Sequence, residues 1–178
     1  MNTNHKSIKM KKSFTILFIL LINFAFAQEK EMNGSIYKNG LYIKTVKTLM
    51  NSYKTNSITR IKNEYQKISV ENIVFRDALN NMDEENPLGK KMDLNEEMKN
   101  MSKLFETYEI VSIKELGYPD HLDYKDGNDL VLSWWQFNWK NKTSGNVGPI
   151  HLMVGHFFNQ NDKIIGETYY LNPSTFPK

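Results

Sequence analysis

Hydrophobic side chains in the first half of the chain recur with the period of an α-helix. Over residues 42–53 they fall at steps of four, three, one and three positions, as Tyr42, Val46, Leu49, Met50 and Tyr53. A second stripe, over residues 58–68, follows Ser57, which is a favourable helix N-cap. A third helix is predicted from Asp93, because Asp93 and Glu96 have the spacing of a capping box.

Beyond about residue 110 the hydrophobic period changes to the alternation of β-strands. Four strands separated by short polar turns are predicted there, over residues 110–116, 130–139, 150–158 and 164–171. A shorter strand, Ile73–Phe75, precedes the third helix and ends near Asp77. Short turns imply antiparallel pairing, and helices gathered on an antiparallel sheet form an α+β domain. We therefore expect a single α+β domain.

The N-terminal segment has the composition of a cleavable signal peptide. Four lysines precede an apolar run of about 12 residues, whereas a membrane-spanning helix needs roughly 20. The run ends with the small residues Ala25 and Ala27, which suit a signal peptidase. A start at Met10 instead of Met1 would keep a basic region. We therefore expect an exported protein, periplasmic or secreted, with no membrane partner after cleavage.

The predicted domain organisation follows from this cleavage. A signal peptide covers residues 1–27, an N-terminal linker residues 28–39, and one domain residues 40–178. Removing the four lysines of the signal leaves 19 basic and 20 acidic residues, a net charge of −1. These charges are scattered, so no nucleic-acid partner is expected. The chain contains no cysteine, which excludes disulfides and a thiol nucleophile.

The order of these segments resembles the nuclear transport factor 2-like superfamily, which includes SnoaL-like polyketide cyclases and ketosteroid isomerases. The most specific segment is Asp162-Lys163-Ile164, which opens the last strand and is followed by Tyr169-Tyr170. The likeness covers roughly residues 40–173. It implies a curved antiparallel sheet wrapped around three N-terminal helices, forming a cone with an apolar cavity. It also implies a homodimer formed through the outer face of the sheet.

Asp77 and two histidines are the candidates for acid–base catalysis. Asp77 ends the first strand, where the resemblance implies the general base of ketosteroid isomerases. The Pro-x-Gly that follows this base in the isomerases is missing, and Leu49 replaces their oxyanion-binding tyrosine. Asp77 could instead cap the strand end. His151 and His156 are five positions apart on one strand, so they project to opposite faces and at most one lines the cavity. Each could instead be a structural or interface histidine. His121 is expected in an exposed turn.

Aromatic residues in the C-terminal half suggest a site for a small hydrophobic or aromatic molecule. The candidate ligand-binding residues are Tyr53, Trp135, Phe137, Met153, Tyr169 and Tyr170. The alternative is that these side chains form core on one face and a dimer interface on the other. Trp134 has the opposite parity to Trp135 and Phe137, so it is the candidate interface residue. No spacing typical of a metal site, a phosphate loop or a dinucleotide site occurs, and no metal or cofactor is predicted.

Three hypotheses about function remain open. The leading one is noncatalytic binding of a small hydrophobic or aromatic molecule in the cavity, because the sheet is rich in aromatic residues and the sequence shows no complete set of catalytic residues. The second is a SnoaL-like or isomerase-like enzyme that uses Asp77 and one histidine for proton transfer. The third is a dimeric interaction module whose cavity is filled by side chains.

Overall fold

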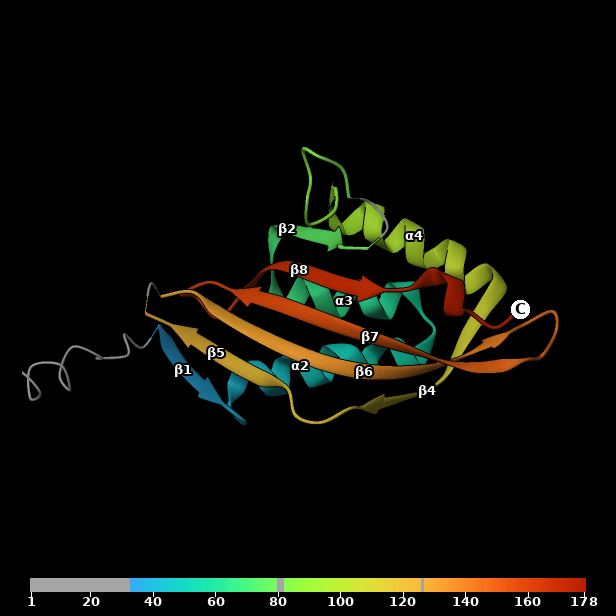
Figure 1. The fold of residues 1–178 in the computed structure, drawn as a ribbon, viewed down its shortest axis with the longest axis horizontal. Helices are drawn as coiled ribbons and strands as arrows, with labels where there is room; N and C mark the ends of the chain where they lie inside the picture. Colours follow the sequence, from blue (N-terminus) through green and yellow to red (C-terminus); the bar gives the residue numbers. More distant parts are fainter. Residues whose placement is uncertain (1–32, 80–81, 126) are drawn as a thin grey trace, which may run out of the picture. The chain divides into compact units, whose positions relative to one another are not determined.

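The chain divides into two units, Met1–Asn33 and Gly34–Lys178. The structure, a computed structural model, describes residues 33–79, 82–125 and 127–178 (Figure 1). The predicted signal peptide lies outside the described residues. Within the described part, no helix has both the length and the hydrophobicity needed to span a bilayer.

The second unit is an α+β domain in which the helices precede most of the strands, as the sequence predicts. The helices are α2 (Leu41–Ser52), α3 (Ile58–Ile68) and α4 (Leu94–Thr107), with the short 3-10 turns η1 (Tyr53–Thr55) and η2 (Pro173–Thr175). The strands are β1 (Gly34–Tyr37), β2 (Ser69–Asp77), β3 (Lys91–Met92), β4 (Tyr108–Glu115), β5 (Asp120–Tyr124), β6 (Asp129–Asn141), β7 (Val147–Phe158) and β8 (Ile164–Leu171). The residues of β1 lie in the segment predicted to be a linker, yet they pair with β5.

Two of the helices begin at the residues that the sequence indicates. The Ser57 hydroxyl accepts a hydrogen bond from the Arg60 amide at the start of α3. At the start of α4, the Asp93 carboxylate accepts hydrogen bonds from the amides of Asn95 and Glu96, both at 2.8 Å. The Glu96 carboxylate accepts in turn from the Asp93 amide, at 3.1 Å. This reciprocal pair is a capping box, and it fixes where α4 starts and therefore which of its side chains face the sheet.

The strands form one mixed sheet in the order β1-β5-β6-β7-β8-β2-β3, with β4 also pairing β6 (Figure 1). The pairs joined by short turns, β5 with β6, β6 with β7 and β7 with β8, are antiparallel, as predicted. The pair of β2 with β8 is parallel, which the sequence does not predict. This pairing brings β2, which lies early in the chain, beside β8, the last strand.

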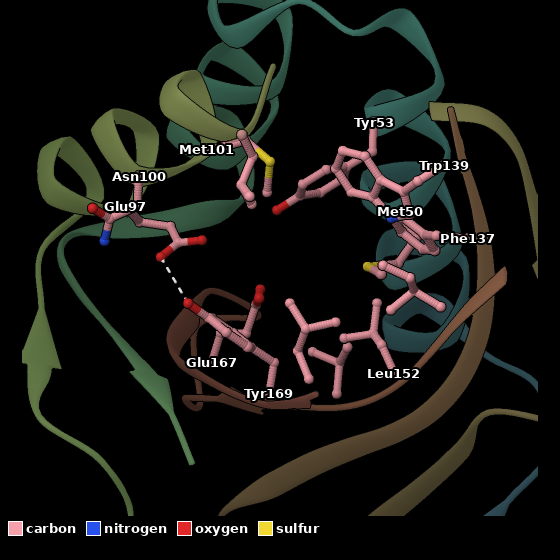
Figure 2. A pocket seen from close by; sticks show the side chains of 14 residues that line it. Met50, Tyr53, Glu97, Asn100, Met101, Phe137, Trp139, Leu152, Glu167 and Tyr169 are labelled. Carbon is pink, nitrogen blue, oxygen red and sulfur yellow. Dashed lines mark hydrogen bonds between the residues drawn. The ribbon is translucent and has the colours of Figure 1, made fainter. Parts of the chain in front are cut away.

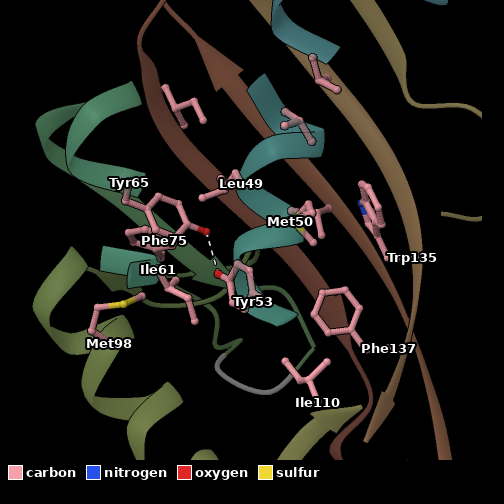
Figure 3. Close-up of a cluster of buried hydrophobic side chains, with 14 of the residues drawn as sticks. Leu49, Met50, Tyr53, Ile61, Tyr65, Phe75, Met98, Ile110, Trp135 and Phe137 are labelled. Atoms are coloured by element: carbon pink, nitrogen blue, oxygen red, sulfur yellow. Dashed lines mark hydrogen bonds between the residues drawn. The ribbon is translucent and has the colours of Figure 1, made fainter. Parts of the chain in front are cut away.

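The two faces of the sheet differ in burial. On β6 the buried side chains alternate as Val131, Ser133, Trp135, Phe137 and Trp139. We call the face that carries them the inner face, because it packs against buried residues of the helices such as Leu49, Met50 and Ile61 (Figure 3). Trp134 lies on the opposite, outer face, as its parity predicts.

Strand β8 departs from regular alternation. The register of β7 against β8 pairs Phe157 with Gly166 and Phe158 with Ile164, so Ile165 is an extra residue, a β-bulge. As a result Ile164 and Glu167, three positions apart, are both buried. Side chains three apart on a regular strand would face opposite sides.

The prediction for His121 is wrong. His121 lies in β5, between β1 and β6, and not in an exposed turn. Its Nε2 lies 2.6 Å from the Asp129 carboxylate, and its ring packs edge-on against Tyr42. The strand formed by residues 120–124 brings these partners together, and this cluster closes one end of the core.

Candidate functional site

A cavity lies between α4, η1 and the inner faces of β6, β7 and β8 (Figure 2). Its volume, measured as the space that the centre of a water molecule can occupy, is about 90 Å³. Since one water needs roughly 10–15 Å³ by this measure, the space suffices for several waters or one small molecule. The wall is mainly apolar, and consists of Met50, Tyr53, Glu97, Asn100, Met101, Leu104, Phe137, Trp139, Ile150, Leu152, Val154, Glu167, Tyr169 and Leu171.

Glu97 is a buried carboxyl group in the α4 wall of this cavity, and its side chain is only 5% exposed. The Tyr169 hydroxyl donates a hydrogen bond to its Oε2 at 3.1 Å. Burial, followed by the negative charges of Glu167 and Asp77, raises the pKa of Glu97 from 4.5 to about 7, against the opposing effect of the Tyr169 hydrogen bond. Figure 2 shows the second oxygen of Glu97 directed into the cavity. Glu97 can therefore take up or release a proton near neutral pH.

Glu167 is the second buried carboxyl group, in the β8 wall, and it is also 5% exposed. The Tyr65 hydroxyl donates to its Oε2 at 2.6 Å, and the Tyr53 and Tyr65 hydroxyls are themselves hydrogen bonded at 2.9 Å (Figure 3). His156 Nε2 lies 3.0 Å from the same Oε2. This contact has ion-pair distance but does not count as a hydrogen bond, since neither ring nitrogen of His156 has a hydrogen-bond partner among the described residues. The two contacts of Glu167, with the Tyr65 hydroxyl and the His156 ring, are thus made by residues outside the cavity wall.

The tyrosines around the two carboxyl groups remain protonated donors at all physiological pH values. Burial raises the pKa of Tyr53 and Tyr65 well above the ordinary value, and the charge of Glu167 adds to the effect. Burial and the charge of Glu97 raise the pKa of Tyr169 in the same direction. The site therefore combines hydroxyl donors with carboxylate acceptors in an apolar surrounding, which strengthens each hydrogen bond.

The structure separates the predicted ligand-binding residues into two groups. Tyr53, Phe137 and Tyr169 line the cavity. Trp135 is buried in the adjoining core and does not line it. Met153 and Tyr170 pair with each other across β7 and β8 on the outer face, because the neighbouring residues of both strands are the ones that point inward. Those two side chains cannot contact a molecule in this cavity.

The predicted acid–base residues do not meet in the cavity. Asp77 Oδ1 accepts a hydrogen bond from the Leu79 amide at 3.2 Å, in the turn after β2, and the charge of Asp77 contributes to the raised pKa of Glu97. His151 is exposed on the outer face, with Nε2 3.4 Å from Gln136. His156 is fully buried on the inner face beside Glu167, outside the cavity wall. The two histidines do project to opposite faces, as their spacing predicts.

Sequence reasoning missed both carboxyl groups of the site. A signal for Glu97 exists, since it lies three positions after Leu94 and four before Met101, on the apolar stripe of its helix. Glu167 offers no comparable signal. Among the residues that the structure describes, no three His, Asp, Glu or Cys side chains gather closely enough to hold a metal ion.

Comparison with known proteins identifies the fold. No protein-family model matches the sequence, and no curated protein matches it. Among solved structures, BvnE pinacolase from Penicillium brevicompactum matches with a TM-score of 0.56 at 9% identity, covering 75% of this chain and 87% of that one. The epoxide hydrolase/cyclase-like enzyme SalBIII, which has a role in pyran ring formation in salinomycin, matches with a TM-score of 0.53 at 9% identity over 75% and 92% of the two chains.

A nuclear transport factor 2-like protein of unknown function from Exiguobacterium sp. 255-15 matches with a TM-score of 0.50 at 14% identity, over 72% of this chain and 98% of that one. The neighbours therefore include both enzymes and proteins of unknown function. The chain has the nuclear transport factor 2-like fold, of the type shared with SnoaL-like and ketosteroid isomerase-like proteins. At these identities the similarity concerns the fold alone.

Proposed function

We propose that the domain binds one small molecule in the cavity, with an apolar body and a polar end directed at Glu97 and Glu167. The observation that carries this proposal is an apolar cavity of about 90 Å³ with two buried carboxyl groups in its wall. A buried carboxyl group without full pairing destabilises the fold, so a ligand that pairs the Glu97 carboxyl group in this cavity would stabilise the protein. Phe137 and Trp139 offer flat apolar surfaces for the body of such a molecule.

Native mass spectrometry of the protein purified from its own host tests this proposal. We expect an additional mass from a retained small molecule. Leu152→Trp places a large ring in the cavity and should abolish retention, whereas Leu132→Trp adds the same ring on the outer face and should leave retention unchanged. An empty protein in every preparation contradicts the proposal, as does retention that survives Leu152→Trp in a folded protein.

A second candidate function, acid–base catalysis, is favoured by the pKa of Glu97. A carboxyl group with a pKa of about 7 in an apolar cavity suits proton transfer at neutral pH, and the adjacent tyrosines could stabilise a developing oxyanion. In this form the enzyme hypothesis uses Glu97 instead of Asp77 and a histidine. It predicts that host small-molecule extract changes on incubation with the wild type but not with Glu97→Gln, while the exposed control Glu106→Gln behaves as the wild type. No difference among the three would count against catalysis.

Export and dimerisation remain proposals that rest on the sequence. The outer face supports a dimer in that Trp134 stands there with the half-buried Leu130 and Leu132. Trp134→Glu should then shift the protein to a monomer in size-exclusion chromatography without unfolding it, and an unchanged elution volume would sink this assignment. N-terminal sequencing of the mature protein tests export, with Gln28 the expected first residue.

A further inference from the structure

The cavity wall has an unbalanced charge. Its described residues include two carboxyl groups and no lysine, arginine or histidine. We propose that the ligand is a small organic amine, bound as its ammonium ion between Glu97 and Glu167 with its apolar body against Phe137 and Trp139. This inference rests on the proposed binding function and names the chemical class of the ligand.

The hydrogen-bonding needs of the wall favour a cation over a neutral ligand. Glu167 already accepts a hydrogen bond from the Tyr65 hydroxyl and contacts His156, and neither residue lines the cavity. Among the described residues, Glu97 accepts a hydrogen bond only from Tyr169. An ammonium group has three donors and a full positive charge, so it can serve both carboxylates at once, whereas an alcohol has a single donor and no charge. Charge-assisted hydrogen bonds are about twice as strong as neutral ones.

The rest of the wall also suits an ammonium ion. The aromatic ring of Tyr53 lines the same cavity, and aromatic faces attract cations within roughly 6 Å, while Phe137 and Trp139 remain for the apolar body. A metal ion is less suited to this site, because the described residues do not offer three ligands at one point. The apolar majority of the wall would contact the hydrocarbon part of an organic amine.

Proton exchange links binding to pH. The titratable groups that face Glu97 are Glu167 and Tyr169 from β8, Asp77 from β2 and Tyr53 from η1, and none of them is basic. At neutral pH a proton therefore occupies Glu97 in part of the molecules. An ammonium ion binds best when that proton has left, so affinity should rise with pH through about 7 and level off above it.

Isothermal titration calorimetry with benzylamine and benzyl alcohol tests the inference, since the two probes share one apolar body. At pH 8 we expect benzylamine to bind at least tenfold more tightly than benzyl alcohol. Its affinity should fall by about tenfold between pH 8 and pH 6, the loss expected when a carboxylate with a pKa near 7 must lose its proton before binding. Glu97→Gln should reduce the preference, because Glu167 is then the remaining carboxyl group of the described wall, and should abolish the pH dependence. Glu106→Gln, an exposed change on the same helix, should preserve both.

The outcomes separate this inference from the proposed function. If benzyl alcohol binds as tightly as benzylamine, the amine assignment is overturned and binding in the cavity stands. If benzylamine binds equally well to Glu97→Gln, the site is wrong. If neither probe binds, the amine inference falls, and the host-purified mass spectrum decides independently whether the binding function falls with it. Circular dichroism confirms that Glu97→Gln, a near-isosteric change, is folded.

Discussion

The two walls of the cavity each carry one glutamate, and the two are equally buried but differently paired. Glu167 on β8 receives the Tyr65 hydroxyl at 2.6 Å and lies 3.0 Å from His156. Glu97 on α4 has one donor, Tyr169, at 3.1 Å. Each is 5% exposed, so the degree of burial does not distinguish them. On β8, contacts with Tyr65 and His156 hold the Glu167 carboxyl group against the core. On α4, the second oxygen of the Glu97 carboxyl group faces the cavity and can accept further hydrogen bonds there.

This difference indicates that the contacts a buried acid makes, and not its degree of burial alone, decide its role. Hydrogen bonds to a charged group contribute about 1.5–3 kcal/mol each, so a well-paired carboxylate is part of the structure and its loss exposes its donors. A poorly paired one instead takes up a proton, as the raised pKa of Glu97 indicates. We therefore expect substitutions of Glu167 and Glu97 to change stability in opposite directions at a pH above about 7.

The largest effect is expected from Glu167→Ala. This change leaves the Tyr65 hydroxyl and the fully buried His156 without their partner, and should lower the free energy of unfolding by about 3–5 kcal/mol. Urea unfolding at pH 7 measures the loss. Glu71→Ala, at an exposed position of β2, should change stability by less than about 0.5 kcal/mol. A loss from Glu167→Ala as small as that of the control would mean that the β8 wall is not structural.

The next effect has the opposite sign. The folded protein holds the Glu97 proton more tightly than the unfolded chain, with a pKa of about 7 against 4.5. The wild-type free energy of unfolding should therefore fall as pH rises from about 4.5 to 7, by about 3 kcal/mol at roughly 1.4 kcal/mol per pH unit. Glu97→Gln removes this slope and should be the more stable protein at pH 8.

Urea unfolding of the wild type, Glu97→Gln and the control Glu106→Gln at pH 5 and pH 8 would show this. The control should keep the wild-type pH dependence, because Glu106 is exposed. A variant at position 97 that is less stable than the wild type at pH 8 would show that Glu97 is as well paired as Glu167.

The smallest effects compare the tyrosine donors of the two walls. Tyr65→Phe removes the donor to Glu167 and the partner of Tyr53, and should destabilise the protein by about 2 kcal/mol. Tyr169→Phe should cost about 1 kcal/mol or less, and should move the titration of Glu97 to higher pH, because the Tyr169 hydrogen bond lowers the pKa of Glu97. Carbon-13 NMR of labelled glutamate follows that titration. A midpoint that stays in place would contradict the assigned hydrogen bond.

The sequence predicts the frame of the domain better than its site. The helix starts at Ser57 and Asp93 and the alternation of β6 are local signals, and all three are confirmed. Glu97 follows Glu96 in the first turn of α4, where acidic residues are expected in any case because they complement the helix dipole. From this rule both glutamates would be predicted to be solvent-exposed. Only the spacing of Glu97 from Leu94 and Met101 indicates that it lies on the buried face of the helix.

Glu167 could not be placed in this way. The bulge at Ile165 shifts the parity of β8, so that Ile164 and Glu167 both face the interior, and a simple alternation misassigns one of them. The parallel pairing of β2 with β8 is likewise invisible locally, because α4 and five strands, β3 to β7, lie between the two along the chain. Pairing between strands that are distant in the chain determines which β8 side chains line the cavity, and a single sequence contains no record of that pairing.

The parallel pairing of β2 with β8 also bears on how quickly the cavity forms. Its strands lie far apart along the chain, and contacts of this kind slow folding because a long loop must close before they form. β8 lies between β7 and β2, so Glu167 reaches its place only when that final strand docks. We therefore expect the helices and the β6–β7 hairpin to order first, and the second carboxyl group to complete the cavity in the slowest phase of folding.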